Sequence, residues 1–141
     1  MFKILIRFSL LLIIFLLILT GGLLIKLYNE TNTIYVTPSN YASILEDAHE
    51  NIDKYLNKKI VVTGYVYIQD DFSANRFVIA QNIYLDYIHS SEPFIVGFLC
   101  ENATDYTVSP DQTIKLIGKI QRGVYNDLEY PIVKVTQIES L

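Results

Sequence analysis

The hydrophobic positions of this chain follow three patterns in succession. Residues 8–25 form a continuous stretch of 18 uncharged, mostly apolar residues. Between Pro38 and Leu56, apolar residues recur three and four positions apart, as on the buried face of an amphipathic helix. After Lys59 the period shortens to two, which is typical of β-strands with one buried face. The pattern therefore predicts an apolar segment, one amphipathic helix and a β-rich remainder.

The apolar stretch at residues 8–25 is long enough to cross a bilayer core of ~30 Å as a helix that rises ~1.5 Å per residue. A cleaved signal peptide is the alternative, but apolar residues resume after the small pair Gly21–Gly22. Lys3 and Arg7 precede the stretch, whereas only Lys26 follows it closely. Because positive charge stays on the cytoplasmic side, we expect a single-pass anchor in the cell membrane, with a cytoplasmic N-terminus and an extracytoplasmic domain.

The remainder predicts a small domain built mainly of strands. We expect three parts: a transmembrane anchor at 1–26, a spacer at 27–38 and a domain at 39–141 that begins with the amphipathic helix. A further short strand is compatible with residues 33–36. The strands of the domain are expected at residues 60–68, 76–81, 93–101, 113–121 and 129–138.

Glycines in the middle of three predicted strands indicate how these strands are arranged. Gly64, Gly97 and Gly118 each interrupt an apolar run, and a central glycine marks a bulge or a sharp bend in a strand. The fold class is therefore mainly β with one helix. We expect an OB-like (oligonucleotide/oligosaccharide-binding) five-stranded, partly open barrel preceded by the amphipathic helix. A flat meander or half-sandwich is the alternative.

Charge narrows the partners that such a domain can have. Residues 27–141 carry 8 Lys and Arg against 15 Asp and Glu, a net charge of −7. Such an acidic surface repels phosphate backbones, so we expect no nucleic acid partner. Cations and neutral protein surfaces are the easier partners. Cys100 is the single cysteine of the sequence, which excludes an intramolecular disulfide, and its place in a strand predicts a buried, inert thiol.

The chemistry-bearing residues give two candidate sites and no enzyme motif. The sequence contains no nucleophile elbow, zinc-protease motif or phosphate-binding loop, so we expect a protein that is not an enzyme. Asp86, His89 and Glu92 are a candidate divalent-metal site, because residues three apart in a helical turn face the same way and imidazole with carboxylate suits Zn²⁺. Solvation of a loop is the alternative for these three side chains. No other cofactor is expected.

The second candidate site is an aromatic face on the expected barrel. OB-like sheets bind ligands through side chains of their central strands, and Tyr65, Tyr67 and Phe77 are placed on such strands. A carbohydrate or cell-wall ligand is the candidate for this face, and the acidic balance of the domain makes a nucleic acid the least expected ligand.

Several segments also resemble a known family. The runs YLNKKIVVTGYVY, FSANRFVIA, PFIVGFLC, IKLIGKI and EYPIVKVTQIE resemble the C-terminal domain of YcgQ-like bacterial membrane proteins, and less specifically OB-fold domains of the tRNA anticodon-binding-like group. YcgQ-like proteins are permease-partner subunits, so the resemblance implies an OB-like fold and a permease-associated, metal-handling role as one alternative. The family's adjacent cysteine pair falls on Asp86 and Tyr87 and is absent from this chain.

Together these features predict a membrane-anchored, extracytoplasmic OB-like module that binds or assists another membrane or envelope protein, such as a permease. Metal handling and carbohydrate or cell-wall binding are the alternatives.

Overall fold

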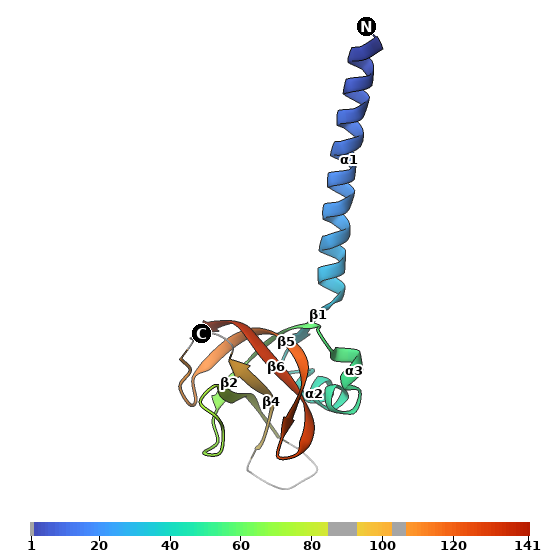
Figure 1. Cartoon of the computed structure of the whole chain (residues 1–141). Helices are drawn as coiled ribbons and strands as arrows, with labels where there is room; N and C mark the ends of the chain where they lie inside the picture. The colour runs from blue at the N-terminus through green and yellow to red at the C-terminus, as the bar shows by residue number, and fades with distance from the viewer. Residues whose placement is uncertain (1, 85–92, 103–106) are drawn as a thin grey trace. The chain divides into compact units, whose positions relative to one another are not determined.

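The computed structural model describes residues 2–84, 93–102 and 107–141, with side chains from residue 12 onward except at 28–31. The chain divides into two units, residues 1–33 and 34–141. The first unit is almost entirely the helix α1 (Phe2–Thr31), and the second contains two further helices and most of the strands (Figure 1).

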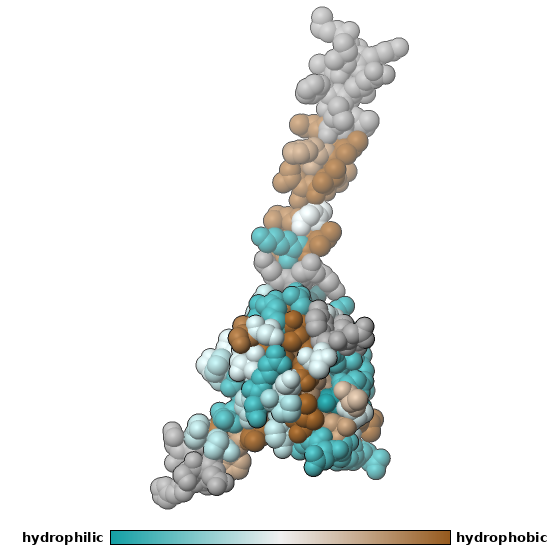
Figure 2. Space-filling view, turned by 90° about the vertical axis from the view of Figure 1, so that its left-hand side faces the viewer, coloured by the Kyte–Doolittle hydropathy of each residue, from teal (hydrophilic) through white to brown (hydrophobic). Residues whose placement is uncertain are grey.

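Helix α1 carries the apolar stretch found in the sequence. Its described large apolar side chains are exposed, with Ile18 at 68% and Leu24 at 66%, and most of this part of the helix is coloured as hydrophobic in Figure 2. Within the part of the chain that the structure describes, no helix meets the length and hydropathy needed to span a membrane. The anchor at residues 8–25 stays a prediction.

The region predicted as a spacer, residues 27–38, is more ordered than expected. Helix α1 continues to Thr31, because a helix that has formed propagates readily through residues that do not break it. The short strand β1 (Thr33–Val36) follows after one residue, at the place where the sequence was compatible with a strand.

The second unit is mainly β, as predicted. After β1, its elements are α2 (Tyr41–Glu50), α3 (Ile52–Tyr55), β2 (Lys59–Tyr67), β3 (Arg76–Ile83), β4 (Phe94–Asn102), β5 (Thr113–Tyr125) and β6 (Leu128–Ser140). The sheet therefore contains six described strands, one more than the five expected for the domain. Strands β5 and β6 form a longer hairpin than predicted, because their pairing continues to Tyr125 and Leu128.

The strand order of the sheet is β1-β2-β3-β4-β6-β5, and β2 also pairs with β5. Strands β3 to β6 therefore each have two bonded neighbours, and β2 has three. The pairs β2–β3, β2–β5, β3–β4 and β5–β6 are antiparallel. The pair β4–β6 is parallel, with Leu99 opposite Ile132 and Asn102 opposite Val135.

The prediction of one continuous amphipathic helix is wrong. Asn51 lies between α2 and α3 with φ −126° and ψ 49°, outside the helical region. Asn is a weak helix former because its side chain competes for backbone hydrogen bonds, which favours a break at this position. The spacing of the apolar residues gave no sign of the break, because it continues unchanged through Ile52 and Tyr55. Figure 1 shows α2 and α3 next to each other beside the strands.

Two of the central glycines have different structural roles. At Gly118 the register between β5 and β6 shifts, so the predicted irregularity is present there. At Gly64 the pairing with β5 is continuous, but a Cβ atom would lie 2.5 Å from the carbonyl oxygen of Ala80. Gly64 is therefore required by the close approach of β2 and β3 rather than by a bulge.

The core lies between the inward faces of the strands and helix α2. Ile60, Val62, Phe77, Ile79, Phe98 and Leu116 are among its fully or almost fully buried side chains. Tyr41 of α2 joins this core, with its ring centroid 5.7 Å from that of Phe98. Its hydroxyl donates a hydrogen bond to the carbonyl oxygen of Ile79 at 2.5 Å, so the buried polar atom has a partner. Burial raises the pKa of the Tyr41 phenol.

Candidate functional site

A shallow groove of about 540 Å³ lies on the outer side of the sheet. It combines two aromatic rings with apolar and polar side chains and one carboxylate. The described residues that line it are Tyr65, Tyr67, Asn82, Pro93, Ile95 and Asp111.

The alternation of the strands brings four of these residues to one face. Even-numbered residues of β2 from Ile60 to Val66 are buried, so the odd-numbered Tyr65 and Tyr67 point outward and are half-buried. The strand register places Tyr65 opposite Ala80 of β3, and Ala80 in turn opposite Gly97 of β4. In the next row Asn82 lies opposite Ile95. Ala80 is fully buried, and the groove is bordered by the two tyrosines of β2 and by Asn82 and Ile95 of the neighbouring strands.

Asp111 reaches the groove from the segment that precedes β5. Its backbone N–H donates a hydrogen bond of 2.8 Å to the carbonyl oxygen of Val66, and the N–H of Val66 donates one of 2.9 Å to the carbonyl oxygen of Gln112. The φ angle of Asp111 is 64°, a left-handed conformation that Asp and Asn adopt more readily than most residues. Because Val66 lies between Tyr65 and Tyr67 in β2, these bonds fix Asp111 beside both tyrosines.

Polar contacts orient one ring of the groove. The hydroxyl of Tyr65 donates a hydrogen bond to Oδ1 of Asn82 at 2.7 Å. Partial burial and then the negative charge of Asp111 raise the pKa of the Tyr65 phenol, so Tyr65 is uncharged at neutral pH. Among the described residues of the groove, two aromatic rings therefore lie next to one exposed carboxylate, that of Asp111.

The predicted aromatic face is only partly assembled. Tyr65 and Tyr67 lie together in the groove. Phe77, the third predicted member, is 1% exposed and belongs to the core, because it lies one position from Val78, which pairs with Tyr67 on the outer face. The remaining groove residues were not predictable, because the register between strands is needed to place them. A longer second strand, ending at Ile83 rather than Gln81, would have included Asn82.

The predicted metal site lies outside the described residues. Asp86, His89 and Glu92 all fall in the segment 85–92, which the structure does not describe. Over the described ranges, no group of three or more His, Cys, Asp and Glu side chains could hold a metal ion.

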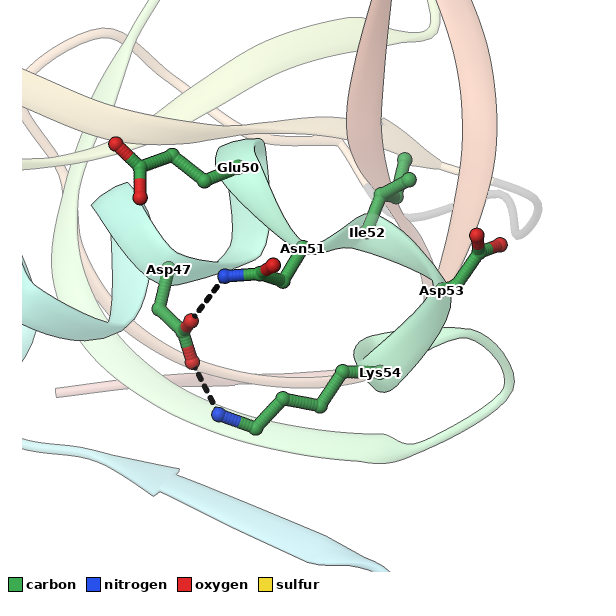
Figure 3. Close-up of a pocket in the computed structure, with 6 residues that line it drawn as sticks. All are labelled: Asp47, Glu50, Asn51, Ile52, Asp53 and Lys54. Atoms are coloured by element: carbon green, nitrogen blue, oxygen red, sulfur yellow. Dashed lines mark hydrogen bonds and ion pairs between the residues drawn. The ribbon is translucent and has the colours of Figure 1, made fainter.

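A second pocket lies where α2 and α3 meet and is lined by Asp47, Glu50, Asn51, Ile52, Asp53 and Lys54 (Figure 3). The Asp47 carboxylate accepts hydrogen bonds from Asn51, Lys54 and Tyr55. These bonds, led by the one from Lys54, lower the pKa of Asp47 to about 2. In Figure 3 the side chains of Glu50 and Asp53 point away from this carboxylate.

Asp53 has a partner of its own across the fold. Arg122 of β5 donates hydrogen bonds to both Asp53 and Glu129. Because Asp47 and Asp53 each bond within the protein, the charged groups of this pocket connect the two short helices to each other and to the β5–β6 hairpin. We therefore assign this pocket a structural role and take the tyrosine groove as the candidate site.

Cys100 is placed as the sequence predicted. It is fully buried, and burial raises the pKa of its thiol to about 12. A thiol with that pKa is protonated at neutral pH and is a poor nucleophile.

Comparison with models of protein families gives one match. Residues 23–141 match the model of the DUF1980 C-terminal domain, so the match covers most of the sequence. The chain belongs to the DUF1980 C-terminal domain family. No curated protein matches it.

Proposed function

We propose that this chain is a membrane-anchored, extracytoplasmic OB-like module that binds another membrane or envelope protein through the tyrosine groove. The groove defined by Tyr65, Tyr67 and Asp111 is the observation that carries the proposal. It is a concave surface in which aromatic rings lie beside a carboxylate, and binding surfaces in proteins are enriched in tyrosine.

The pairing of the strands supports the OB-like part of the proposal. Strands β2, β3, β4, β6 and β5 follow one another and return to β2, with a parallel β4–β6 pair. Five strands joined in this way form a small OB-like barrel, and such barrels bind ligands over their outer strands and adjoining loops. The groove occupies that position, on β2, β3 and β4 and the segment before β5.

The exposed apolar surface of α1 supports the anchor. Its described large side chains, from Leu12 to Leu27, are at least 47% exposed. Apolar surface of this extent is unfavourable in water and favourable in lipid. Lys3 and Arg7 at the N-terminal end favour an orientation with the β domain outside. The family resemblance to permease-partner proteins supports a membrane or envelope protein as the partner.

Site-specific photo-crosslinking in intact cells tests the proposal. The full chain, expressed at its native level, would carry p-benzoylphenylalanine in place of Tyr67 or, as the control, in place of Leu128. Leu128 is 60% exposed and lies outside the groove, in the β5–β6 hairpin. We expect one defined membrane or envelope protein to be captured from position 67 and not from position 128. Equal capture from both positions, or none from position 67, contradicts the proposal.

A further inference from the structure

The described lining of the groove carries charge of one sign, which is negative. Among the described residues that line it, Asp111 is the single charged one, and no Lys or Arg is present. The second unit as a whole is acidic, since residues 34–141 carry 8 Lys and Arg against 14 Asp and Glu, a net charge of −6. The potential at the groove therefore favours cations and opposes anionic ligands.

The other surfaces of the groove favour a particular kind of cation. The rings of Tyr65 and Tyr67 lie beside the carboxylate, and an aromatic face attracts an organic ammonium or guanidinium group through its quadrupole. A divalent metal ion is a poor fit, because it needs several oxygen ligands and the described lining offers a single carboxylate. Ile95, 52% exposed, and Pro93 add an apolar wall for the alkyl part of a long side chain.

We propose that the groove binds a lysine or arginine side chain in an extended segment of the partner protein. The ammonium or guanidinium group lies against the Asp111 carboxylate and the tyrosine rings, and the alkyl stem packs on Ile95 and Pro93. The inference rests on the proposed function, since it names the chemistry that the partner presents to the same groove. Charge complementarity, with an acidic domain and one acidic groove residue, selects this occupant over a second copy of the chain.

Two aspartates allow a matched test. Asp111 and Asp127 are both exposed, and both have positive φ angles, 64° and 62°. Asn replaces either one with the same loss of charge and with little backbone strain. Asp127 lies in the turn between β5 and β6, outside the groove. Asp111→Asn and Asp127→Asn therefore separate binding in the groove from attraction to the whole acidic domain.

The probe is a fluorescein-labelled peptide with two lysines between Gly-Ser pairs, measured by fluorescence anisotropy against the full chain in an uncharged detergent. The same peptide with both lysines acetylated is the neutral probe. We expect acetylation to weaken binding about tenfold, Asp111→Asn to weaken it about fivefold and Asp127→Asn to change it by less than about twofold. Tyr67→Leu, which removes the ring, is expected to weaken binding about fivefold.

Equal effects of Asp111→Asn and Asp127→Asn overturn the inference, because they indicate general attraction to an acidic surface. Equal binding of the acetylated peptide, or absence of binding to the lysine peptide, overturns it as well. If a partner is crosslinked from position 67 while the lysine peptide does not bind, the proposed function stands and the cationic segment is wrong. If the lysine peptide binds in the groove but no partner is captured there, the proposed function fails and the cation site stands.

Discussion

Asp111 donates its backbone N–H to the carbonyl oxygen of Val66 at 2.8 Å, although 45 positions separate the two residues in the sequence. The bond joins the segment before β5 to the strand that carries both groove tyrosines. It also holds Asp111 at φ 64°, where a Cβ-bearing residue other than Asp or Asn is strained. The geometry of the groove therefore depends on this one residue through its backbone as well as through its charge.

The positive φ angle of Asp111 predicts that the effect of a substitution on stability depends on how well the new residue adopts this backbone conformation. Asp111→Val should lower the free energy of unfolding by about 1–2 kcal/mol, because a β-branched residue is disfavoured at positive φ. Asp111→Asn should leave the stability almost unchanged. Chemical denaturation of the full chain in detergent measures both. Equal stability of the two variants contradicts this explanation.

The close approach at Gly64 predicts a large difference between two glycine substitutions. Gly64→Ala places a Cβ atom 2.5 Å from the carbonyl oxygen of Ala80, a backbone atom that cannot move aside cheaply. We expect a loss of about 1–3 kcal/mol in the stability of the β domain. Gly22→Ala, for which nothing lies within 4 Å of the added atom, is the control and should leave this stability unchanged. Thermal unfolding, followed by the near-UV circular dichroism of the tyrosines, measures the stability of the Gly64→Ala and Gly22→Ala variants.

The ion cluster around Glu101 predicts unequal effects of two charge removals. Glu101, 14% exposed, accepts hydrogen bonds from Arg76 at 2.6 and 2.9 Å and is also paired with Lys134. Glu101→Gln leaves two cations without their carboxylate and should cost about 1.5–3 kcal/mol of unfolding free energy. Glu139→Gln removes a more exposed pair with Lys115 and should cost at most about 1 kcal/mol. Urea titration of both variants tests this order.

The hydrogen bonds to Asp47 predict an acid-sensitive contribution to stability. The hydrogen bonds lower the pKa of this carboxyl to about 2 in the folded protein, below its ordinary value of 3.8, so the folded state binds the proton more weakly than the unfolded state. The stabilisation is present above about pH 4 and is lost as the pH falls toward about 2. Asp47→Asn should therefore flatten the dependence of unfolding free energy on pH in this window. Glu50→Gln, whose side chain points away from Asp47, is the charge-matched control.

The burial of Cys100 predicts a thiol that does not react in the folded protein. This allows an added cysteine to report on which side of the membrane the domain lies. The full chain should react with a membrane-impermeant maleimide only after denaturation, because Cys100 is fully buried and its pKa is about 12. Asp127→Cys adds an exposed thiol in the β5–β6 turn. We expect intact cells to label this variant and not the wild type. Labelling of Asp127→Cys only after the cells are lysed contradicts an extracytoplasmic domain.

The strands of the fold were largely predictable from sequence, and the break between the helices was not. Alternation of buried and more exposed residues is clear in the central parts of β2 and β5, whereas β4 was predictable from its apolar run, of which Phe98, Leu99 and Cys100 are all buried. The spacing of apolar residues did not reveal the break at Asn51, because it continues across this residue as it would in an unbroken helix. The last residues of β5, from Arg122 to Tyr125, were missed because Val124 is apolar but exposed, so no alternation of polar and apolar residues marks them.

The candidate site was less predictable than the fold. Tyr65 and Tyr67 are two positions apart in one strand, so their common face follows from the period of two. The inward position of Phe77 depends on the register between β2 and β3, which a single sequence does not encode locally. Asp111 joins the groove through a bond to Val66 that connects distant segments, and no local pattern in the sequence indicates this contact.

The parallel pair β4–β6 determines when this domain can finish folding. Strand β6 follows β4 and β5 in the sequence and lies between them in the sheet. Until β6 pairs with both strands, β4 and β5 each lack one neighbour and leave backbone hydrogen-bonding groups unpaired at an edge. Closure of the sheet therefore depends on contacts between residues far apart in the sequence, and such non-local contacts slow folding.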